Sequence, residues 1–201
     1  MANPETKLTI ANTALLKLGQ SPIASLTDEY SSNARAMNRF INNARRGVLE
    51  LANWSFATKR VKLAQDAVAP AFGFDHQYTL PADFLRPQVV YSAVNPEVEL
   101  DAKSGGYKIE NGKLLTDADN VYLIYTYNRE DISGMSTSFT DLWSEKLVAD
   151  AAYTVTKSLS EATSRLQFFQ LMVPQASSTD HIGDPEDLVI DTSPLTSNLG
   201  V

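Results

Sequence analysis

The sequence predicts an α+β fold: a helical bundle of about four helices, one of them long, with an inserted small antiparallel β-sheet. Apolar residues recur at helical spacing up to Asn53, alternate in steps of two from Trp54, and return to helical spacing at Phe139. We therefore expect a bundle formed by residues 1–53 and 138–176, a β insertion over residues 54–130, and an extended C-terminal arm over residues 177–201.

The composition is that of a folded, acidic protein. Of 201 residues, 43% are hydrophobic, and the formal net charge is −7. Because phosphate contacts need basic surface, this balance argues against a broad grip on nucleic acid, although an acidic wall would let DNA pass without adhering. The chain has no cysteine, which excludes disulfides, thiolate nucleophiles and zinc–thiolate sites. We expect no membrane partner, because no apolar run approaches the ~20 residues that cross a bilayer and the start does not resemble a secretory signal.

The first helix is expected over residues 4–18. Asn3 can cap it, and Pro4 fits its first position. Gly19 should end it in a left-handed conformation. Its apolar stripe consists of Leu8, Ala11, Leu15 and Leu18.

The long helix is expected over residues 28–53, capped by Thr27 or Asp28. Its apolar residues follow in steps of four and three: Tyr30, Ala34, Met37, Ile41, Ala44, Val48 and Leu51. Such a regular repeat suits packing against other helices, from the same chain or from a neighbouring subunit. We assign this packing or subunit interface to Tyr30, Met37, Ile41 and Val48.

One side of the same helix is basic. It carries Arg35, Arg39 and Arg46, with Asn42 on the same side and Arg45 close by. These arginines could face a partner or the phosphates of DNA. The alternative is a solvated helix face that pairs with acidic groups.

The insertion is expected to hold about five strands, mainly antiparallel, within residues 54–128. The run VYLIYTY, residues 121–127, is β-branched and aromatic, which predicts a central strand. In YKIENGKLLT, Asn111 and Gly112 predict a two-residue type I′ turn. The resulting register would pair Glu110 with Lys113 and Ile109 with Leu114.

The stretch YTLPADFLRP, residues 78–87, carries two prolines in a strand-like sequence. Each proline removes a backbone donor and holds the residue before it extended. We expect a strand over residues 78–80, a fixed corner, and a second strand from about Gln88. Phe84 and Leu85 are the apolar anchors of this corner.

Two further helices are expected after the insertion. The first covers residues 139–158 with Ser138 as its cap, and the second covers residues 160–173 with Ser160 as its cap. Pro174 should kink or end the second helix.

The last part of the chain, residues 177–201, is acidic and rich in serine, threonine and proline, which predicts an arm outside the packed body. It contains an apolar island of Leu188, Val189 and Ile190. This island could add a strand to a neighbour's sheet edge or dock in a groove. The alternative is an end with no role.

We find no catalytic, cofactor or metal signature in the sequence, and we expect the protein not to be an enzyme. The two histidines, His76 and His181, have no triad motif around them. Residues 117–128 begin like a calcium loop but lack its glycine and its final glutamate. Carboxylate pairs such as Glu97 with Glu99 and Asp141 with Glu145 could flank a glycosidic bond, but any acidic protein offers such pairs.

Five stretches together resemble the tail tubular protein A family of short-tailed bacteriophages, the head-to-tail adaptors. They are ANTALLKLGQSPIASL, ARAMNRFINNARRGVLELANWSFATKRVKLA, YTLPADFLRP, YLIYTYNRED and FTDLWSEKLVADAAYTVTKSLS, in the family's order and over most of residues 6–160. The most specific are WSFA after a long helix and LPADFLR. The resemblance implies a virion protein of the tail, assembled in the host cytoplasm into a dodecameric ring between the portal protein and the tail nozzle protein. DNA would pass through the ring without specific binding.

In such a ring subunit the proline corner would rigidly redirect the strands of the insertion, with Asp83 and Arg86 available for structural pairing. We expect Trp54, Phe56, Phe84 and Leu85 to form the joint between the helices and the sheet. The resemblance makes the portal or an adjacent subunit the receiver of the C-terminal arm. Three other functions stay open: a tail-associated peptidoglycan or polysaccharide hydrolase, a head-tail connector of a long-tailed phage, and a regulatory binding module.

Overall fold

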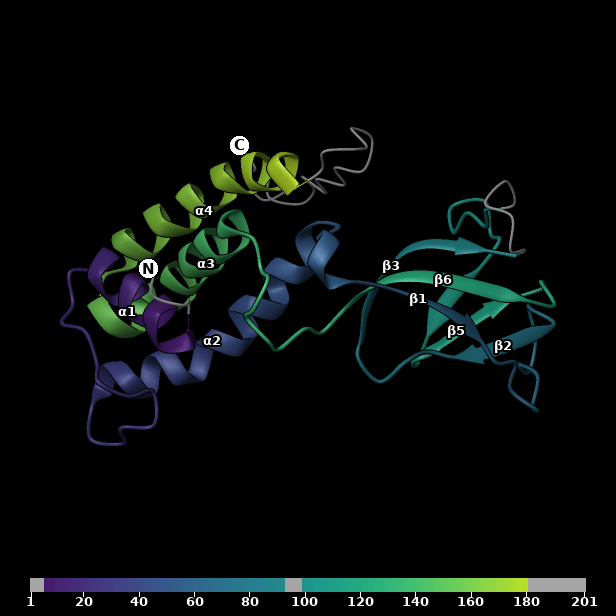
Figure 1. The fold of residues 1–201 in the computed structure, drawn as a ribbon, viewed down its shortest axis with the longest axis horizontal. Helices are drawn as coiled ribbons and strands as arrows, with labels where there is room; N and C mark the ends of the chain where they lie inside the picture. The colour runs from purple at the N-terminus through teal and green to yellow at the C-terminus, as the bar shows by residue number, and fades with distance from the viewer. Residues whose placement is uncertain (1–5, 93–98, 181–201) are drawn as a thin grey trace, which may run out of the picture.

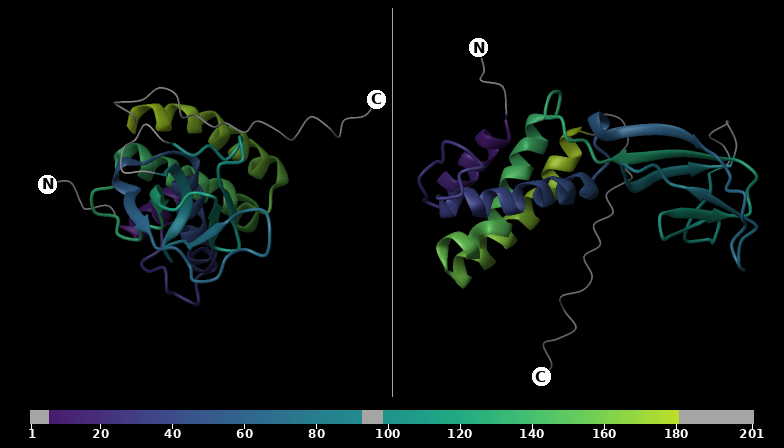
Figure 2. Two further views of the ribbon diagram at one scale, coloured as in Figure 1. Left: turned by 90° about the vertical axis from the view of Figure 1, so that its right-hand side faces the viewer. Right: turned by 90° about the horizontal axis from the view of Figure 1, so that it is seen from below.

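The computed structural model of the protein describes residues 6–92 and 99–180. It has an α+β fold with four α-helices and two three-stranded antiparallel sheets. The helices form a bundle at one end of an elongated molecule, and the strands form a β unit at the other end (Figure 1). The right-hand view of Figure 2 shows the β unit extending from the bundle along the long axis.

The first helix, α1 (Lys7–Lys17), begins later than predicted. Thr6 is its N-cap, with an extended backbone at φ −130°, and its hydroxyl accepts a hydrogen bond from the amide of Thr9. The predicted cap and first position, Asn3 and Pro4, lie outside the described residues. Gly19 follows the helix with φ +69°, as predicted.

The long helix, α2 (Ser32–Leu51), is also shorter than predicted. Its N-cap is Ser31, whose hydroxyl accepts from the amide of Ala34 at 3.2 Å. Asp28 does not cap it, because its carboxylate accepts from the amide of Tyr30 instead and closes a separate turn. Tyr30 therefore precedes the helix and is 99% exposed, so it does not pack between the helices of its own chain. Its alternative assignment, to a subunit interface, stays a prediction.

The last two helices are α3 (Thr137–Thr156) and α4 (Leu159–Asp180). Ser136, rather than Ser138, caps α3 through a hydrogen bond from the amide of Phe139. Lys157, with φ +59°, ends α3 in the left-handed region. Ser158, rather than Ser160, caps the start of α4, where its hydroxyl accepts from the amide of Glu161.

Pro174 does not end α4, which continues to Asp180. The predicted helix end at residue 173 and the predicted arm start at residue 177 are therefore wrong. A proline removes one helical hydrogen bond, but tertiary packing supplies most of the stability of a helix in a protein. Here Phe169, Met172 and Val173 pack against the bundle core in the turn before the proline.

Six strands form the β unit, in two sheets where the sequence predicted about five strands in one. The first sheet has the order β1-β6-β3, with β1 (Thr58–Leu63), β6 (Val121–Tyr127) and β3 (Phe84–Tyr91). The second has the order β2-β5-β4, with β2 (His76–Thr79), β5 (Lys113–Thr116) and β4 (Lys108–Glu110). The central position of β6 in its sheet is confirmed.

The start of the β unit and its proline corner differ in detail from the prediction. A 3-10 turn, η1 (Ser55–Ala57), precedes β1, so strand pairing begins at Thr58 rather than at Trp54. Strand β3 begins at Phe84 instead of near Gln88. It contains Pro87, which is tolerated because β3 is an edge strand with a register shift directly after that residue.

The β4–β5 hairpin is confirmed in its register. Glu110 pairs with Lys113, and Ile109 pairs with Leu114. The two turn residues, Asn111 and Gly112, have φ angles of +47° and +72°. Positive φ at both positions is what a type I′ turn requires, which explains the choice of these two residues.

Two apolar cores hold the molecule together. The bundle core gathers buried side chains of α1, α2 and α3 with Phe169 of α4, and it includes Trp54 and Trp143. The β core lies in the β unit and includes Tyr78, Leu114 and Leu123. Tyr127, the last residue of β6, packs against both cores.

Candidate functional site

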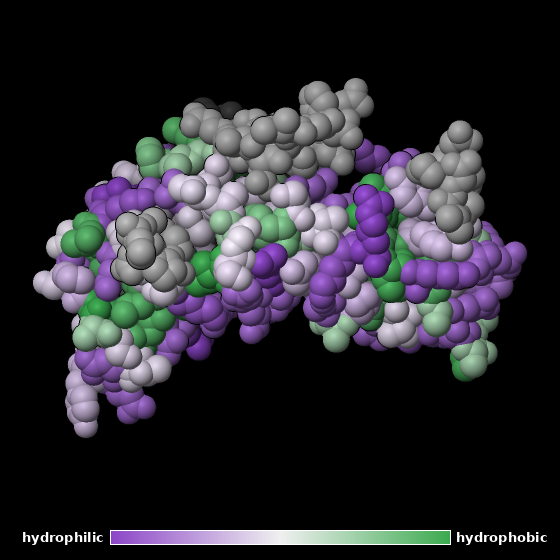
Figure 3. Space-filling view, in the orientation of Figure 1, coloured by the Kyte–Doolittle hydropathy of each residue, from purple (hydrophilic) through white to green (hydrophobic). Residues whose placement is uncertain are grey.

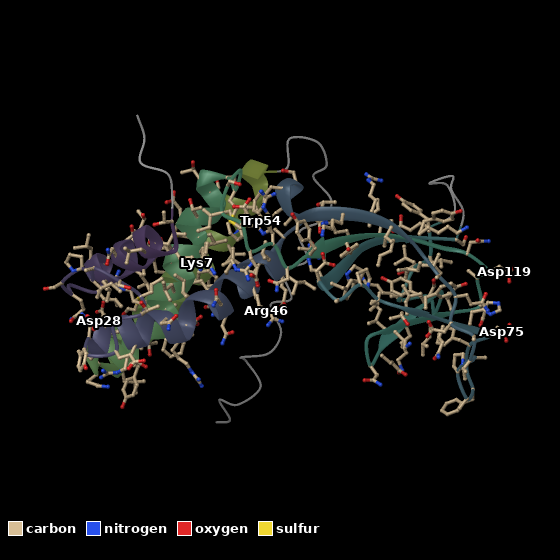
Figure 4. All side chains as sticks on the ribbon, turned by 60° about the horizontal axis from the view of Figure 1, so that its bottom comes forward. Lys7, Asp28, Arg46, Trp54, Asp75 and Asp119 are labelled. Carbon is tan, nitrogen blue, oxygen red and sulfur yellow. The ribbon has the colours of Figure 1, made fainter. Side chains whose placement is uncertain are left out.

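The joint between the bundle and the β unit is built around Trp54, labelled in Figure 4. Its ring is fully buried, and its Nε1 donates to the carbonyl oxygen of Val48 at 2.9 Å. This carbonyl lies in the last turn of α2, where the helix itself offers no partner, so the indole acts as a side-chain cap. The ring also packs edge-on against Phe139 of α3, with centroids 5.1 Å apart.

The predicted joint residues divide between the two cores. Phe56 stacks edge-on against Phe139 at 5.0 Å, and Leu85 packs against the bundle core from strand β3. Phe84, the neighbour of Leu85, faces the β core instead, with its ring 5.8 Å from that of Tyr125. Adjacent residues of a strand point to opposite sides of the sheet, so the first two residues of β3 contact both cores.

Polar side chains add to this joint. Arg86 of β3 donates to the side-chain oxygen of Asn53, just beyond the end of α2. Arg129, which follows β6, donates from Nη1 to the carbonyl oxygen of Phe56 at 2.8 Å, and its guanidinium lies 5.8 Å from the centroid of the Phe56 ring. Neither Arg129 nor Tyr127 could be recognised from the sequence, because no periodic pattern marks a residue at the end of a strand.

Arg45 is a buried cation of α2, with 1% of its surface exposed. Its Nη2 donates to the side-chain oxygen of Asn128 at 2.9 Å and lies 4.0 Å from the carboxylate of Glu130. Its Nε and Nη1 have no hydrogen-bond partner among residues 6–92 and 99–180. Burial lowers the pKa of this guanidinium from its ordinary value. The helical spacing could have indicated this burial, because Arg45 lies between Ile41 and Val48 on the apolar stripe.

The proline corner is held by Asp83. Its carboxylate accepts from Lys59 Nζ at 2.6 Å and from the Tyr125 hydroxyl at 3.0 Å, and its backbone oxygen accepts from the amide of Asn128. Burial alone would raise the pKa of Asp83, but the hydrogen bonds from Lys59 and Tyr125 together hold it below its ordinary value. Burial, and then the bond to Asp83, raise the pKa of Tyr125 to about 12. The corner is therefore fastened to both β1 and β6.

Three of the predicted packing residues of α2 lie in the core of their own chain. Met37, Ile41 and Val48 are essentially inaccessible to solvent in the single chain. They are consequently not available to a neighbouring subunit, and any subunit interface must use other residues.

The basic side of α2 is exposed. Arg35, Arg39 and Arg46 are all solvent-accessible, and Arg35 donates to the backbone oxygen of Glu29. None of the three forms an ion pair within the part of the chain that the structure describes. Figure 4 marks Arg46 on α2 and Lys7 on neighbouring α1, and Lys7 bonds to Asn42 between the arginines. This Arg/Asn surface suits acidic partners or phosphates.

Helix α4 exposes large apolar side chains although its inner side packs on the bundle. Leu159, Leu166, Phe168 and Leu171 are exposed by 72%, 46%, 48% and 71%. Leu16 of α1 and Tyr153 of α3 are also exposed. The space-filling view shows apolar surface at several places on the bundle (Figure 3). Apolar groups of this size on one helix are typical of a surface that a partner covers.

The candidates for chemistry have structural partners. His76 contacts Asp119 at 3.2 Å and Gln65 at 2.9 Å. Glu145 is buried and bonded to Lys17 at 2.7 Å, whereas Asp141 is exposed. In the described residues, no three His, Cys, Asp or Glu side chains form a group that could hold a metal ion. His181, Glu97 and the island of Leu188, Val189 and Ile190 lie outside those residues.

A small cavity lies between β3 and residues 99–107. Its lining is mixed and rich in polar groups: Asn53, Arg86, Gln88, Glu99, Asp101 and Lys103 contribute, together with Tyr107. The cavity opens beside the joint. Its lining includes two acidic side chains, Glu99 and Asp101, and two basic ones, Arg86 and Lys103.

Comparison with known proteins assigns no family: no family model matches the chain, and no curated protein matches its sequence. Over residues 6–92 and 99–180, no helix combines the length and the apolar character needed to cross a membrane.

Proposed function

We propose that the protein is a structural virion subunit, a head-to-tail adaptor of the tail tubular protein A type, which assembles into a dodecameric ring between the portal and the tail nozzle. The observation that carries the proposal is the number of large apolar side chains that α4 leaves exposed, namely Leu159, Leu166, Phe168 and Leu171. A ring requires one surface of each subunit to bind a different surface of the next. A helix that is half covered by its own chain supplies one such surface.

The joint supports the same role. A ring subunit must hold its two ends in a fixed relative position, and a buried tryptophan, a capped helix end and a fastened proline corner do this here. The order of the five sequence stretches that resemble the adaptor family adds to the argument. No specific observation favours a hydrolase, because Glu145 is engaged by Lys17 and Glu97 is not described.

The test is the mass of the assembled protein with and without its portal. Native mass spectrometry of the purified chain, alone and mixed with the portal protein, should reveal a ring that the portal stabilises. The chain should also be present in purified virus particles. A protein that stays monomeric with the portal and is missing from particles would overturn the proposal.

A matched pair of variants tests the surface on α4. Phe168→Asp should lower the assembled fraction on the order of tenfold, since a charge in an apolar contact is costly to desolvate. Gln167→Asp adds the same charge at the neighbouring exposed position and should assemble normally. If both variants assemble alike, α4 is not the subunit interface.

A further inference from the structure

We infer that the β1–β2 loop is a docking element for another protein, with Phe72 and Val68 as its apolar anchors. The receiving site that fits it is an apolar pocket rimmed by lysine and arginine side chains. The inference concerns the end of the β unit that is far from α4, and it does not depend on the adaptor role.

The loop presents apolar groups where a free surface would be polar. Residues 67–74, AVAPAFGF, contain no charged or hydrogen-bonding side chain. Phe72 is 88% exposed and Val68 is 71% exposed. The loop lies at the outer end of the β unit (Figure 1), and apolar surface marks the lower tip of that end in the space-filling view (Figure 3). Covering an exposed phenylalanine ring with an apolar partner is favourable, because it removes a large apolar surface from water.

The base of the loop is fastened on both sides. On the β1 side, the amide of Asp66 donates to the Gln77 carbonyl oxygen at 2.9 Å, and the Asp66 carboxylate accepts from Lys113 at 2.6 Å and from the Thr79 hydroxyl at 2.8 Å. On the β2 side, the amide of Asp75 donates to the Asp117 carboxylate at 2.9 Å. A loop that is already held in position loses less conformational entropy when it binds, which favours its use as an anchor.

The charges around the loop identify the kind of partner. Asp75, Asp117 and Asp119 are exposed at its base, and Figure 4 shows Asp75 and Asp119 at the same end of the molecule. None of the three pairs with a lysine or arginine within residues 6–92 and 99–180, where Asp119 pairs with His76. A carboxylate rim attracts a cationic surface and repels an anionic one.

This rim argues against the two other occupants. Loops that insert into membranes rely on basic residues to bind anionic headgroups, whereas three carboxylates would be repelled by them. As a receiving site on a second copy of this chain, the cavity beside β3 does not fit, because charged and amide groups such as Arg86, Glu99 and Asp101 contribute to its lining. A different protein with a basic rim is the occupant that satisfies both the apolar and the charged groups.

Photo-crosslinking from the full chain tests the inference. Benzoylphenylalanine replaces Phe72 in the cells that naturally produce the protein, and crosslinked peptides are identified by mass spectrometry. Ser104, an exposed loop residue of the same β unit, carries the same probe as the control. We expect residue 72 to crosslink one other protein, at apolar residues flanked by lysine or arginine, and residue 104 not to do so.

Charge reversal provides the second measurement. Asp75→Lys combined with Asp119→Lys should lower the yield of that crosslink on the order of tenfold, and raised salt should lower the wild-type yield. Phe72→Ser should keep the melting temperature, because the ring is exposed. The inference would be overturned by the absence of a crosslink, by a crosslink to a second copy of the chain, or by a crosslink yield that the charge reversal leaves unchanged. Binding to vesicles of phosphatidylcholine with phosphatidylglycerol would overturn it as well. The adaptor role is tested separately, by native mass spectrometry of the ring and by the presence of the chain in virus particles.

Discussion

Arg45 on α2 donates a hydrogen bond from Nη2 to the side-chain oxygen of Asn128, 2.9 Å away, in the segment that leads from β6 back to the bundle. The pair connects the long helix to the return of the chain from the β unit. Its guanidinium is buried and only partly hydrogen-bonded within the described residues. We expect a buried cation of this kind to add little stability compared with an apolar side chain of similar size.

The first prediction concerns the hydrogen bond between Arg45 and Asn128. Asn128→Ala removes the only short hydrogen bond described for the guanidinium, and leaving a buried charged group unsatisfied should cost about 3 kcal/mol of unfolding free energy. Arg45→Met replaces the cation by an apolar chain of similar length and should change stability by only about 1 kcal/mol. Urea denaturation of both variants measures this. Equal losses would show that the polar pair stabilises the fold directly.

The second prediction concerns Trp54. Trp54→Ala should lower the free energy of unfolding by about 3–5 kcal/mol, because it opens a cavity beside Phe139 and removes the cap on Val48. Trp54→Phe keeps most of the ring but loses the Nε1 donor, so it should cost less. Thermal and urea denaturation provide the values. A small effect of the alanine variant would mean that the joint depends on other residues.

The third prediction is a loss of stability at alkaline pH through Tyr125. Its pKa of about 12 in the folded protein lies above the value of about 10 expected in the unfolded chain. The stabilisation is therefore complete below pH 10 and is lost as the pH rises through 12, with a size on the order of 2 kcal/mol. Tyr125→Phe should flatten this part of the stability curve. An unchanged alkaline profile in that variant would contradict the assignment.

Asp83, which accepts the hydrogen bond from Tyr125, gives a corresponding prediction at acidic pH. Its pKa is depressed in the folded protein, so its contribution is present above the unfolded value of about 4 and is lost as the pH falls through the lower folded value. Asp83→Asn should reduce the acid sensitivity of unfolding. The test is a set of urea denaturation curves from pH 2 to pH 6, with Asp141→Asn, an exposed carboxylate, as the control.

Those parts of the fold that depend on local chemistry could be predicted from the sequence. The turn at Asn111 and Gly112 sets its own register, since both residues accept positive φ. The aromatic run of β6 indicated the central strand because such a run needs cover on both sides. In both cases the information lies within a few neighbouring residues.

Where neighbouring residues compete, the sequence could not decide. Ser31 and Asp28 are both good caps, and the choice depends on a turn at Tyr30 that the periodic pattern does not register. Pro174 ends an isolated helix, yet the packing of α4 on the bundle carries the helix past it. Arg45 was placed among the basic residues of α2 by its charge, whereas its angular position put it in the core.

A further prediction tests the basic side of α2. Replacing Arg35, Arg39 and Arg46 by glutamate should change the unfolding free energy by no more than about 0.5 kcal/mol per substitution, because all three are exposed. If these arginines contact DNA, the wild-type protein should bind duplex DNA weakly at low salt. The slope of the logarithm of its binding constant against the logarithm of the salt concentration should then be up to about 2.7 steeper than that of the triple variant. Fluorescence anisotropy with a labelled duplex measures the slope.

A matched variant shows whether that effect belongs to α2. Glutamate at Arg60, Lys103 and Lys108, three exposed positions of the β unit, makes the same change in net charge. We expect it to leave the salt slope near the wild-type value. Similar slopes for both triple variants would mean that DNA responds to net charge alone, and the arginines would then be assigned to a protein partner.

The last prediction concerns residues 184–201, which include Leu188, Val189 and Ile190. Among the side chains that the structure describes, Val173 is the last that packs against the bundle core, and the β core uses only earlier residues. Deleting residues 184–201 should therefore leave the melting temperature unchanged, while removing four of the acidic side chains, Asp184, Glu186, Asp187 and Asp191. If the apolar island binds the portal or an adjacent subunit, the truncated protein should assemble onto portal rings less completely, because that contact is lost. A second variant, Leu188→Ser with Ile190→Ser, keeps every charge and isolates the apolar part; assembly at the wild-type level in both variants would assign portal binding to the helical bundle alone.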